Sequence, residues 1–182
     1  MNKKPEISLS EGQLSINGKN IEIPKIKLID FIGSGANGVV FQGYDNQLNR
    51  DVAVKIWMPR QGDVYPDKNR FLSEIRKVSP IIRPGIIKIF NADVIEDKYC
   101  YAIFELVDGV TLREWLSSPR NYFSRSLVAR KIVRELIVLH KMKIFHGDLH
   151  DRNIMIRESE EILLLDFGTS VSSTFKCRIK AA

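Results

Sequence analysis

The chain has 182 residues, 44% of them hydrophobic and 27% charged, which is the composition of a globular protein long enough to bury a core. It contains no run of about 18 uncharged apolar residues, and its first residues lack the apolar segment of a signal peptide, so we expect neither a membrane span nor secretion. Two cysteines are too few for a disulfide framework, which fits a cytoplasmic location. The net charge of +6 is compatible with anionic partners, but the basic residues are spread along the chain, which disfavours a nucleic-acid surface.

Residues 1–107 have the pattern of antiparallel strands with one main helix. Asn17 and Gly18 separate two short runs of alternating apolar residues, which predicts a β-hairpin in an N-terminal extension of residues 1–24. In the lobe that follows, residues 25–107, apolar residues recur at spacings of three and four over residues 66–79 and predict a helix. The strands predicted for this lobe cover residues 26–32, 39–44, 51–57, 86–90 and 99–107.

Residues 108–182 are expected to form a smaller, mainly helical lobe. Thr111 and Glu114 have the spacing of a capping box and predict a short helix through residue 116. A longer helix is predicted over residues 124–143, because one stripe of that segment is apolar. Short strands over residues 154–156 and 162–165 complete the pattern, and the predicted fold class is α+β.

A glycine-rich segment lies between the first two strands of the larger lobe. Its glycines would let the backbone approach phosphate oxygens closely and offer N–H donors to them. Glycine-rich hairpins are also often simple turns, so both interpretations stay open. A dinucleotide-binding fingerprint needs a helix after the glycines and a Walker loop needs Gly-Lys-Ser/Thr, and neither follows here. The segment consists of Gly33, Ser34, Gly35, Ala36, Asn37 and Gly38.

Lys55 ends an apolar Val-Ala-Val-Lys strand, where a lysine is costly to bury unless a carboxylate or a phosphate pairs with it. Glu74 is the expected partner, because it lies between Leu72 and Ile75 on the core-facing side of the predicted helix. The alternative is a lysine that reaches solvent from an edge strand and an exposed helix glutamate.

A polar segment over residues 146–153, His-Gly-Asp-Leu-His-Asp-Arg-Asn, is followed by Asp-Phe-Gly over residues 166–168. Magnesium bound to nucleotide phosphates takes oxygen ligands, which Asn153 and Asp166 can supply. Asp148 is placed to accept the proton of an attacking hydroxyl. The alternatives are a polar surface loop and a zinc site, and the second is disfavoured because no cysteine joins the segment and no histidine pair has helical ligand spacing.

In chain order, the glycine loop, Val-Ala-Val-Lys, the helix glutamate, the polar loop and Asp-Phe-Gly resemble the protein kinase signature set over residues 25–170. The resemblance implies a kinase-like fold with an antiparallel N-lobe, one main helix and a minimal, incomplete helical C-lobe. It also implies ATP and Mg²⁺ as cofactors. On this resemblance, Lys55 pairs with Glu74 and holds the α- and β-phosphates, and Asp148 is the catalytic base. Asn153 and Asp166 hold Mg²⁺.

The same resemblance implies the remaining contacts to the nucleotide. The glycine loop would cover the phosphates, and Val40, Ala53 and Met155 would surround adenine. Glu105 to Val107 would form the hinge whose backbone hydrogen-bonds to the base, with Phe104 behind the pocket.

Two residues depart from the common protein kinase pattern. Gly147 stands where most such kinases have arginine, and His150 stands where serine/threonine kinases usually have lysine. This form of the loop is similar to that of bacterial kinase-like proteins and of aminoglycoside and choline kinases. The acceptor hydroxyl therefore belongs to a protein or to a small molecule, and the other motifs favour a protein serine/threonine kinase.

The segment after the Asp-Phe-Gly motif is short, covers residues 169–182, and lacks Ala-Pro-Glu. We therefore expect the long helix to expose apolar surface that a partner or a second copy would cover. Three alternatives follow: an active minimal kinase, a nucleotide-binding pseudokinase with a regulatory role, and a fragment of a longer kinase.

Overall fold

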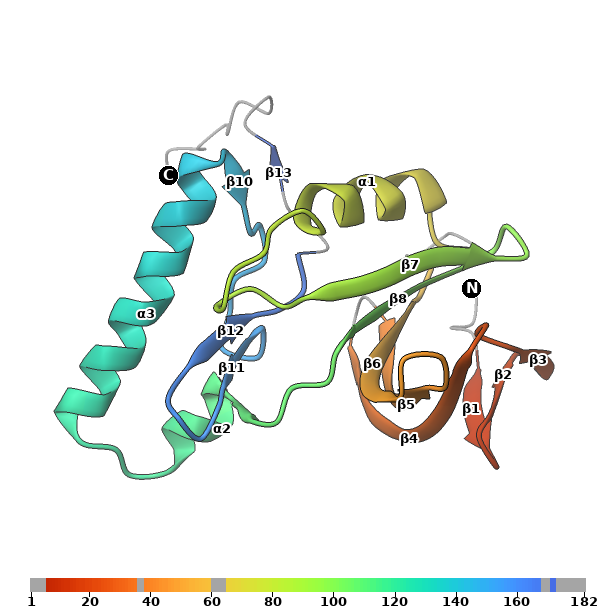
Figure 1. The fold of residues 1–182 in the computed structure, drawn as a ribbon, viewed down its shortest axis with the longest axis horizontal. Helices are drawn as coiled ribbons and strands as arrows, with labels where there is room; N and C mark the ends of the chain where they lie inside the picture. The colour runs from red at the N-terminus through yellow and green to blue at the C-terminus, as the bar shows by residue number, and fades with distance from the viewer. Residues whose placement is uncertain (1–5, 36–37, 60–64, 168–170, 173–182) are drawn as a thin grey trace, which may run out of the picture. The chain divides into compact units, whose positions relative to one another are not determined.

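The computed structural model describes residues 6–35, 38–59, 65–167 and 171–172. The chain divides into two compact units, which are described separately (Figure 1). Unit 1 comprises residues 1–79 and 88–107, and unit 2 comprises residues 80–87 and 108–182.

Unit 1 is built on a five-stranded antiparallel sheet in the order β4-β5-β6-β8-β7. Along β6, Val52, Val54 and Ile56 are buried in one hydrophobic cluster, as expected for alternate residues on one face of a strand. The strands are β4 (Ile26–Gly35), β5 (Gly38–Asp45), β6 (Arg50–Trp57), β7 (Ile89–Ile95) and β8 (Tyr99–Glu105).

A separate three-stranded antiparallel sheet precedes it, formed by β1 (Ile7–Ser10), β2 (Gln13–Ile16) and β3 (Lys19–Ile21). Asn17 and Gly18 connect β2 to β3 with φ of 53° and 75°, the left-handed pair that a two-residue hairpin turn requires. The predicted hairpin is therefore confirmed, and β1 is an addition that the sequence pattern did not predict. Leu14 and Ile16 of β2 lie in the same hydrophobic cluster as Phe41 of β5.

Helix α1 (Lys68–Val78) agrees with the predicted helix to within two residues at its start and one at its end. It begins at Asp67, whose carboxylate accepts hydrogen bonds from the backbone N–H groups of Asn69 and Arg70. Phe71 anchors the helix on the sheet, because its ring packs against Cys100 of β8 and meets the Trp57 ring edge-on at 4.8 Å.

Unit 2 contains α2 (Leu112–Ser117) and α3 (Tyr122–Lys141), whose bounds differ by at most two residues from the predicted helices. Its strands β9 (Val110–Thr111), β11 (Ile154–Ile156) and β12 (Ile162–Leu164) form a sheet in the order β12-β11-β9. Two further short strands, β10 (Ile144–Phe145) and β13 (Val171–Ser172), pair with each other. Trp115 of α2 and Val128 of α3 are buried.

The predicted strand over residues 86–90 is confirmed only at its last two residues and is wrong for the first three, because β7 begins at Ile89. The preceding residues bond to β12 of unit 2 instead: Ile87 donates its N–H to the Leu164 carbonyl at 3.1 Å, and Leu164 donates to the Gly85 carbonyl at 2.9 Å. Arg83 also binds the buried Glu135 of α3 through two hydrogen bonds of 2.7 and 3.1 Å. These long-range bonds, which no local pattern encodes, decide where the segment belongs.

The long helix does expose apolar side chains. Val133 and Ile137 lie half in solvent, and Tyr122 and Phe123 at the start of α3 are 87% and 75% exposed. Among the residues that the structure describes, no helix combines the length and the apolar character needed to span a membrane.

Candidate active site

The glycine loop is an extension of the β4–β5 hairpin. Ser34 pairs with Val39 and Gly35 with Gly38, so the strand pairing, after two register shifts earlier in β4, continues to the residues that flank positions 36 and 37. Ala36 and Asn37, which complete the predicted loop, lie outside the described residues.

The glycines of the loop differ in what a side chain would meet. A Cβ on Gly38 would lie 2.3 Å from the Ile56 carbonyl oxygen, so β5 can pass β6 at this point only without a side chain. At Gly33 and Gly35 an added Cβ would meet no atom of the described chain within 4 Å. Internal packing therefore explains why residue 38 is glycine, whereas Gly33 and Gly35 border open space.

Three of the predicted nucleotide contacts share one face of the sheet in unit 1. Val40 lies directly opposite Lys55 in the β5–β6 pairing, and directly opposite residues point to the same face. Ala53, two residues before Lys55, points to that face as well because side chains alternate along a strand. This face is opposite to the one on which Val54 and Ile56 are buried.

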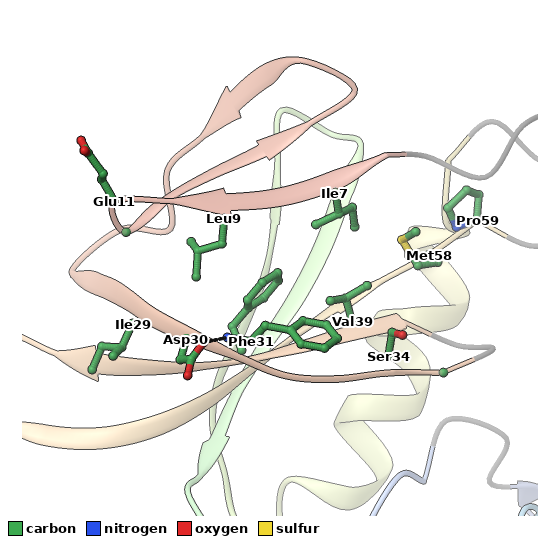
Figure 2. Close-up of a pocket in the computed structure, with 13 residues that line it drawn as sticks. Ile7, Leu9, Glu11, Ile29, Asp30, Phe31, Ser34, Val39, Met58 and Pro59 are labelled. Atoms are coloured by element: carbon green, nitrogen blue, oxygen red, sulfur yellow. Dashed lines mark hydrogen bonds between the residues drawn. The ribbon is translucent and has the colours of Figure 1, made fainter.

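A cavity of about 590 Å³ lies on the other side of the same hairpin (Figure 2). Ile7 and Leu9 of β1 line it from one side and Phe31 lines it from the other, and Phe41 also contributes to the lining. Val39 contributes to the lining, whereas Val40, Ala53 and Lys55 do not. This cavity is therefore distinct from the predicted nucleotide site and, among the residues that the structure describes, shares with it only Ser34 and Gly35 of the glycine loop.

Lys55 and Glu74 are both largely removed from solvent, with 9% of Lys55 and 12% of the Glu74 side chain exposed. The alternative of two solvated side chains is therefore wrong. The Lys55 ammonium lies 4.7 Å from the centre of the Trp57 ring, and the Glu74 carboxylate accepts a 2.8 Å hydrogen bond from Arg70 one helical turn earlier. The pairing of Lys55 with Glu74 stays a prediction.

The predicted hinge follows the end of β8. Glu105 is held to Lys88 twice, because its backbone N–H donates to the Lys88 carbonyl at 3.1 Å and its carboxylate accepts from the Lys88 N–H at 2.9 Å. Phe104 stacks on Trp57 with the ring centres 6.4 Å apart. Val107 ends this part of unit 1, and Met155 lies on β11 of unit 2, opposite Thr111 and Leu163.

His146 organises the polar loop of unit 2. Its Nε2 lies 2.7 Å from the Leu165 carbonyl oxygen, and its Nδ1 lies 3.4 Å from the Asp148 backbone nitrogen. Because a carbonyl can only accept and an N–H can only donate, Nε2 carries the proton and Nδ1 is the acceptor. Burial lowers the pKa of His146 below its ordinary value, which favours this neutral form. The ring also packs against Phe167 at 4.5 Å.

Asn153 connects the loop to the Asp-Phe-Gly segment. Its side-chain Nδ2 donates to the Asp148 carbonyl at 2.9 Å, and its backbone carbonyl accepts from the Leu165 N–H at 2.8 Å. Asp166 follows with φ of 54°, a left-handed backbone that aspartate tolerates better than most residues, and its Oδ1 is buried. Three predicted site residues, Asp148, Asn153 and Asp166, are thus held in one hydrogen-bonded frame.

The donor set of this frame suits a magnesium ion. The Asn153 side chain donates an amide N–H to the Asp148 carbonyl, and its Oδ1 can then act as a metal ligand. Asp166 offers a carboxylate as a second ligand. Hard oxygen donors in this small number match Mg²⁺, which completes its octahedron with phosphate and water. Nowhere in the described ranges do three or more His, Cys, Asp or Glu side chains gather as a closed metal site would need.

The backbone conformation at residue 147 explains why glycine stands where the protein kinase pattern has arginine. Its φ of 81° is a left-handed conformation that is energetically costly for any residue with a Cβ, arginine included. The loop therefore takes a backbone path at this point that suits glycine.

Sequence reasoning did not assign roles to His146, Phe167 or Arg113. The spacing of His146, two residues before Asp148, could have indicated it, because a histidine at that spacing can accept from the backbone N–H of the aspartate. The partners Leu165 and Phe167 are distant in sequence and have no local signal.

Comparison with known proteins places these motifs in a family. A family model described as protein kinase domain matches residues 26–177. The chain is 30% identical over 161 residues to the serine/threonine-protein kinase PrkC of Bacillus subtilis, which covers 86% of this chain and 24% of PrkC. It is 32% identical over 154 residues to the kinase and exchange factor for Rac A of Dictyostelium discoideum, covering 82% of this chain and 11% of that protein. It is 28% identical over 139 residues to the serine/threonine-protein kinase PknL of Mycobacterium tuberculosis, covering 75% of this chain and 35% of PknL. The chain thus spans about a third or less of the length of these relatives.

Proposed function

The chain belongs to the protein kinase family, and from this premise we propose that it transfers the γ-phosphate of Mg-ATP to a serine or threonine hydroxyl of a protein. The observation that carries the proposal is the frame in which His146, Asn153 and Leu165 hold Asp148 and Asp166 together. Phosphoryl transfer depends mainly on positioning and on charge stabilisation, and a rigid frame of this kind supplies the first.

Each half of the site has a separate task in this proposal. In unit 1, Lys55 binds the α- and β-phosphates, Glu74 orients it, and Val40 and Ala53 contact the adenine from the same face of the sheet. In unit 2, Asn153 and Asp166 hold Mg²⁺, which neutralises phosphate charge when it is bound. Glu105 to Val107 bind the base edge through their backbone, and Met155 contacts adenine.

Asp148 is the proposed catalytic base. Its side chain is 41% exposed, so an acceptor hydroxyl can reach the carboxylate. The carboxylate orients that hydroxyl and accepts its proton while the oxygen attacks the γ-phosphorus and the bond to the β-phosphate oxygen breaks. The hydrogen bonds that fix its backbone come from His146 and Asn153.

A small-molecule hydroxyl is a second candidate acceptor. The observation in its favour is the left-handed backbone of Gly147, which disfavours the arginine usual beside the catalytic aspartate of protein kinases. That arginine normally pairs with a phosphate on the activation loop, so we propose that activity here does not require such a phosphate.

The test is transfer from γ-labelled ATP by the purified chain, with casein, myelin basic protein and an aminoglycoside offered in parallel as acceptors. Asp148→Asn and Asp166→Asn should each abolish transfer, whereas Asp93→Asn, an exposed aspartate on β7, should leave it unchanged. Magnesium-dependent nucleotide binding without transfer to any acceptor would contradict catalysis and support a nucleotide-binding regulatory protein. Failure to bind nucleotide would contradict both.

A further inference from the structure

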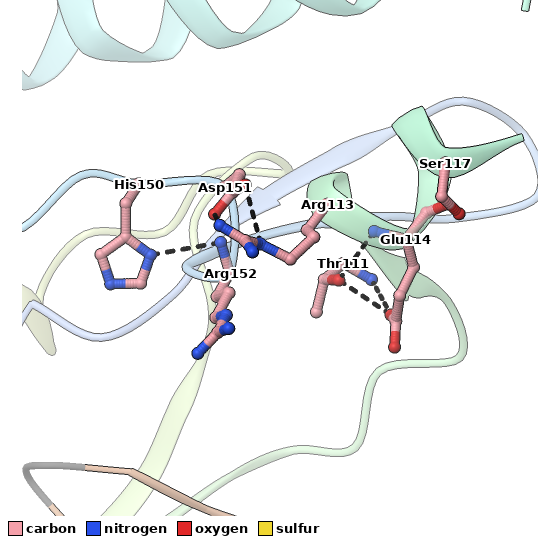
Figure 3. A network of polar contacts seen from close by, with 7 residues as sticks. All are labelled: Thr111, Arg113, Glu114, Ser117, His150, Asp151 and Arg152. Atoms are coloured by element: carbon pink, nitrogen blue, oxygen red, sulfur yellow. Dashed lines mark hydrogen bonds and ion pairs between the residues drawn. The ribbon is translucent and has the colours of Figure 1, made fainter.

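Helix α2 is bonded directly to the middle of the 146–153 loop (Figure 3). Arg113 donates from Nε to Asp151 Oδ2 at 2.9 Å and from Nη2 to Asp151 Oδ1 at 3.3 Å. Its backbone N–H also donates to the Asp151 carbonyl at 3.2 Å. One residue of α2 therefore makes three bonds to one loop residue, and two of them form the bidentate arginine–carboxylate arrangement that fixes orientation as well as distance.

A shift of Asp151 would also move neighbouring residues of the 146–153 loop. It lies between Asp148 and Asn153, and the backbone around it closes on itself. Asn153 donates its N–H to the His150 carbonyl at 3.0 Å, and Arg152 donates its N–H to His150 Nδ1 at 3.2 Å. A displacement of Asp151 would thus move the turn that carries Asn153.

The helix that holds Asp151 is itself well anchored. Thr111 and Glu114 form the predicted capping box, with bonds of 2.8 Å from the Thr111 N–H to the Glu114 carboxylate and 3.2 Å from the Glu114 N–H to Thr111 Oγ1. The backbone N–H and the hydroxyl of Thr111 both donate to the Glu114 carboxylate, which lowers the pKa of Glu114. Strand β9, which leads into α2, pairs with β11 at Thr111 and Met155, two residues beyond Asn153. The start of α2 and the end of the loop are therefore fixed to the same sheet.

We infer that Arg113 is a positioning residue for phosphoryl transfer: through Asp151, in the middle of the loop, it holds the segment that carries Asp148 and Asn153, as His146 does at the start of the loop. This inference rests on the function proposed above, which gives the loop its catalytic task. The Arg113 and Asp151 side chains are 58% and 35% exposed, and exposed ion pairs add little to global stability. Loss of the pair should therefore change the loop geometry and leave the fold intact.

The test compares Arg113→Ala and Arg113→Lys with a matched control in the same unit. Lys131→Ala removes an ion pair of similar length, 2.8 Å to Glu161, and a hydrogen bond of 2.8 Å to the Glu160 carbonyl, and neither touches the loop. Hydrogen exchange at the Asn153 amide and the kcat and KM for ATP are measured on each. We expect Arg113→Ala to lower kcat about tenfold at unchanged KM, because misplacement of a catalytic group by a fraction of an ångström acts on the transition state. Exchange at the Asn153 amide should rise about fivefold, because opening of the loop becomes easier.

The remaining variants separate this inference from the proposed function. Arg113→Lys, which keeps the charge but not the bidentate bonds, should give intermediate values, and Lys131→Ala should match the wild type. The exchanged pair, Arg113→Asp with Asp151→Arg, should recover part of the protection and of kcat, and it replaces Arg113→Ala if that variant does not fold. Faster exchange at the Asn153 amide in Arg113→Ala, in a protein that transfers no phosphate, would overturn the proposed function and support the role of Arg113 in holding the loop. A wild-type kcat and a wild-type exchange rate in Arg113→Ala would overturn the positioning role of Arg113 without contradicting the proposed function.

Discussion

The Nε2 atom of His146 and the main-chain carbonyl of Leu165 are joined by a hydrogen bond of 2.7 Å. This bond ties the start of the 146–153 loop to the residue before Asp166, so a buried neutral imidazole connects the proposed catalytic base to a proposed metal ligand. Four predictions follow from this frame and from the glycines around it.

Replacement of His146 by alanine should destabilise the protein and reduce its activity. The variant leaves the Asp148 N–H and the Leu165 carbonyl without their partner and removes the ring that packs on Phe167. We expect a loss of about 2–4 kcal/mol in the free energy of unfolding, measured by urea denaturation. His140→Ala is the control, because that histidine is exposed on α3 and should cost about 0.5 kcal/mol or less. Equal losses in the two variants would contradict the role of His146.

The stability of the protein should fall as the pH drops below about 6.5, the ordinary pKa of histidine. Burial lowers the pKa of His146 in the folded state, so in this range the unfolded chain binds more protons than the folded one. The free energy of unfolding then rises with pH between the folded and the unfolded pKa, and the full contribution is present above the unfolded value. Urea denaturation at pH 7.5 and 5.5 should give a smaller difference for His146→Gln than for the wild type, and an identical difference would refute this assignment.

Substitutions in the glycine loop should separate packing from ligand binding. Gly38→Ala places a Cβ against the backbone of Ile56, which cannot move aside without distorting β6, and should cost about 1–3 kcal/mol. Gly33→Ala meets open space and should change stability by about 0.5 kcal/mol or less, while it weakens ATP binding if the loop covers phosphates. Thermal unfolding and nucleotide titration of the two variants check this, and an equal loss of stability in both would contradict it.

Gly147→Arg should fail to convert this loop into the common protein kinase form. The left-handed φ of 81° costs a residue with a Cβ about 1–2 kcal/mol, and the strain lies directly before Asp148. We therefore expect lower stability in urea and a lower kcat. Gly147→Asn, which tolerates this backbone better, should lie between the wild type and the arginine variant. A stable, fully active arginine variant would be the contrary result.

Local sequence determined much of the fold because its signals act over a few residues. Asn17 and Gly18 supply the left-handed turn of the N-terminal hairpin, Asp67 caps α1 through its own side chain, and Thr111 with Glu114 starts α2. Ordered motifs along the chain were sufficient to recognise the kinase family, which the family model then matched over residues 26–177.

Tertiary structure decided what depends on partners distant in the chain. Residues 86–90 look like a strand locally, but bonds between Gly85, Ile87 and Leu164 draw the start of that segment to unit 2. The pairing of His146 with Leu165 and of Arg113 with Asp151 likewise joins segments that no periodicity relates. A sequence pattern indicates which residues can be buried and which can donate a hydrogen bond. The packing of the whole chain sets the partner of each one, and the geometry of the candidate site depends on those partners.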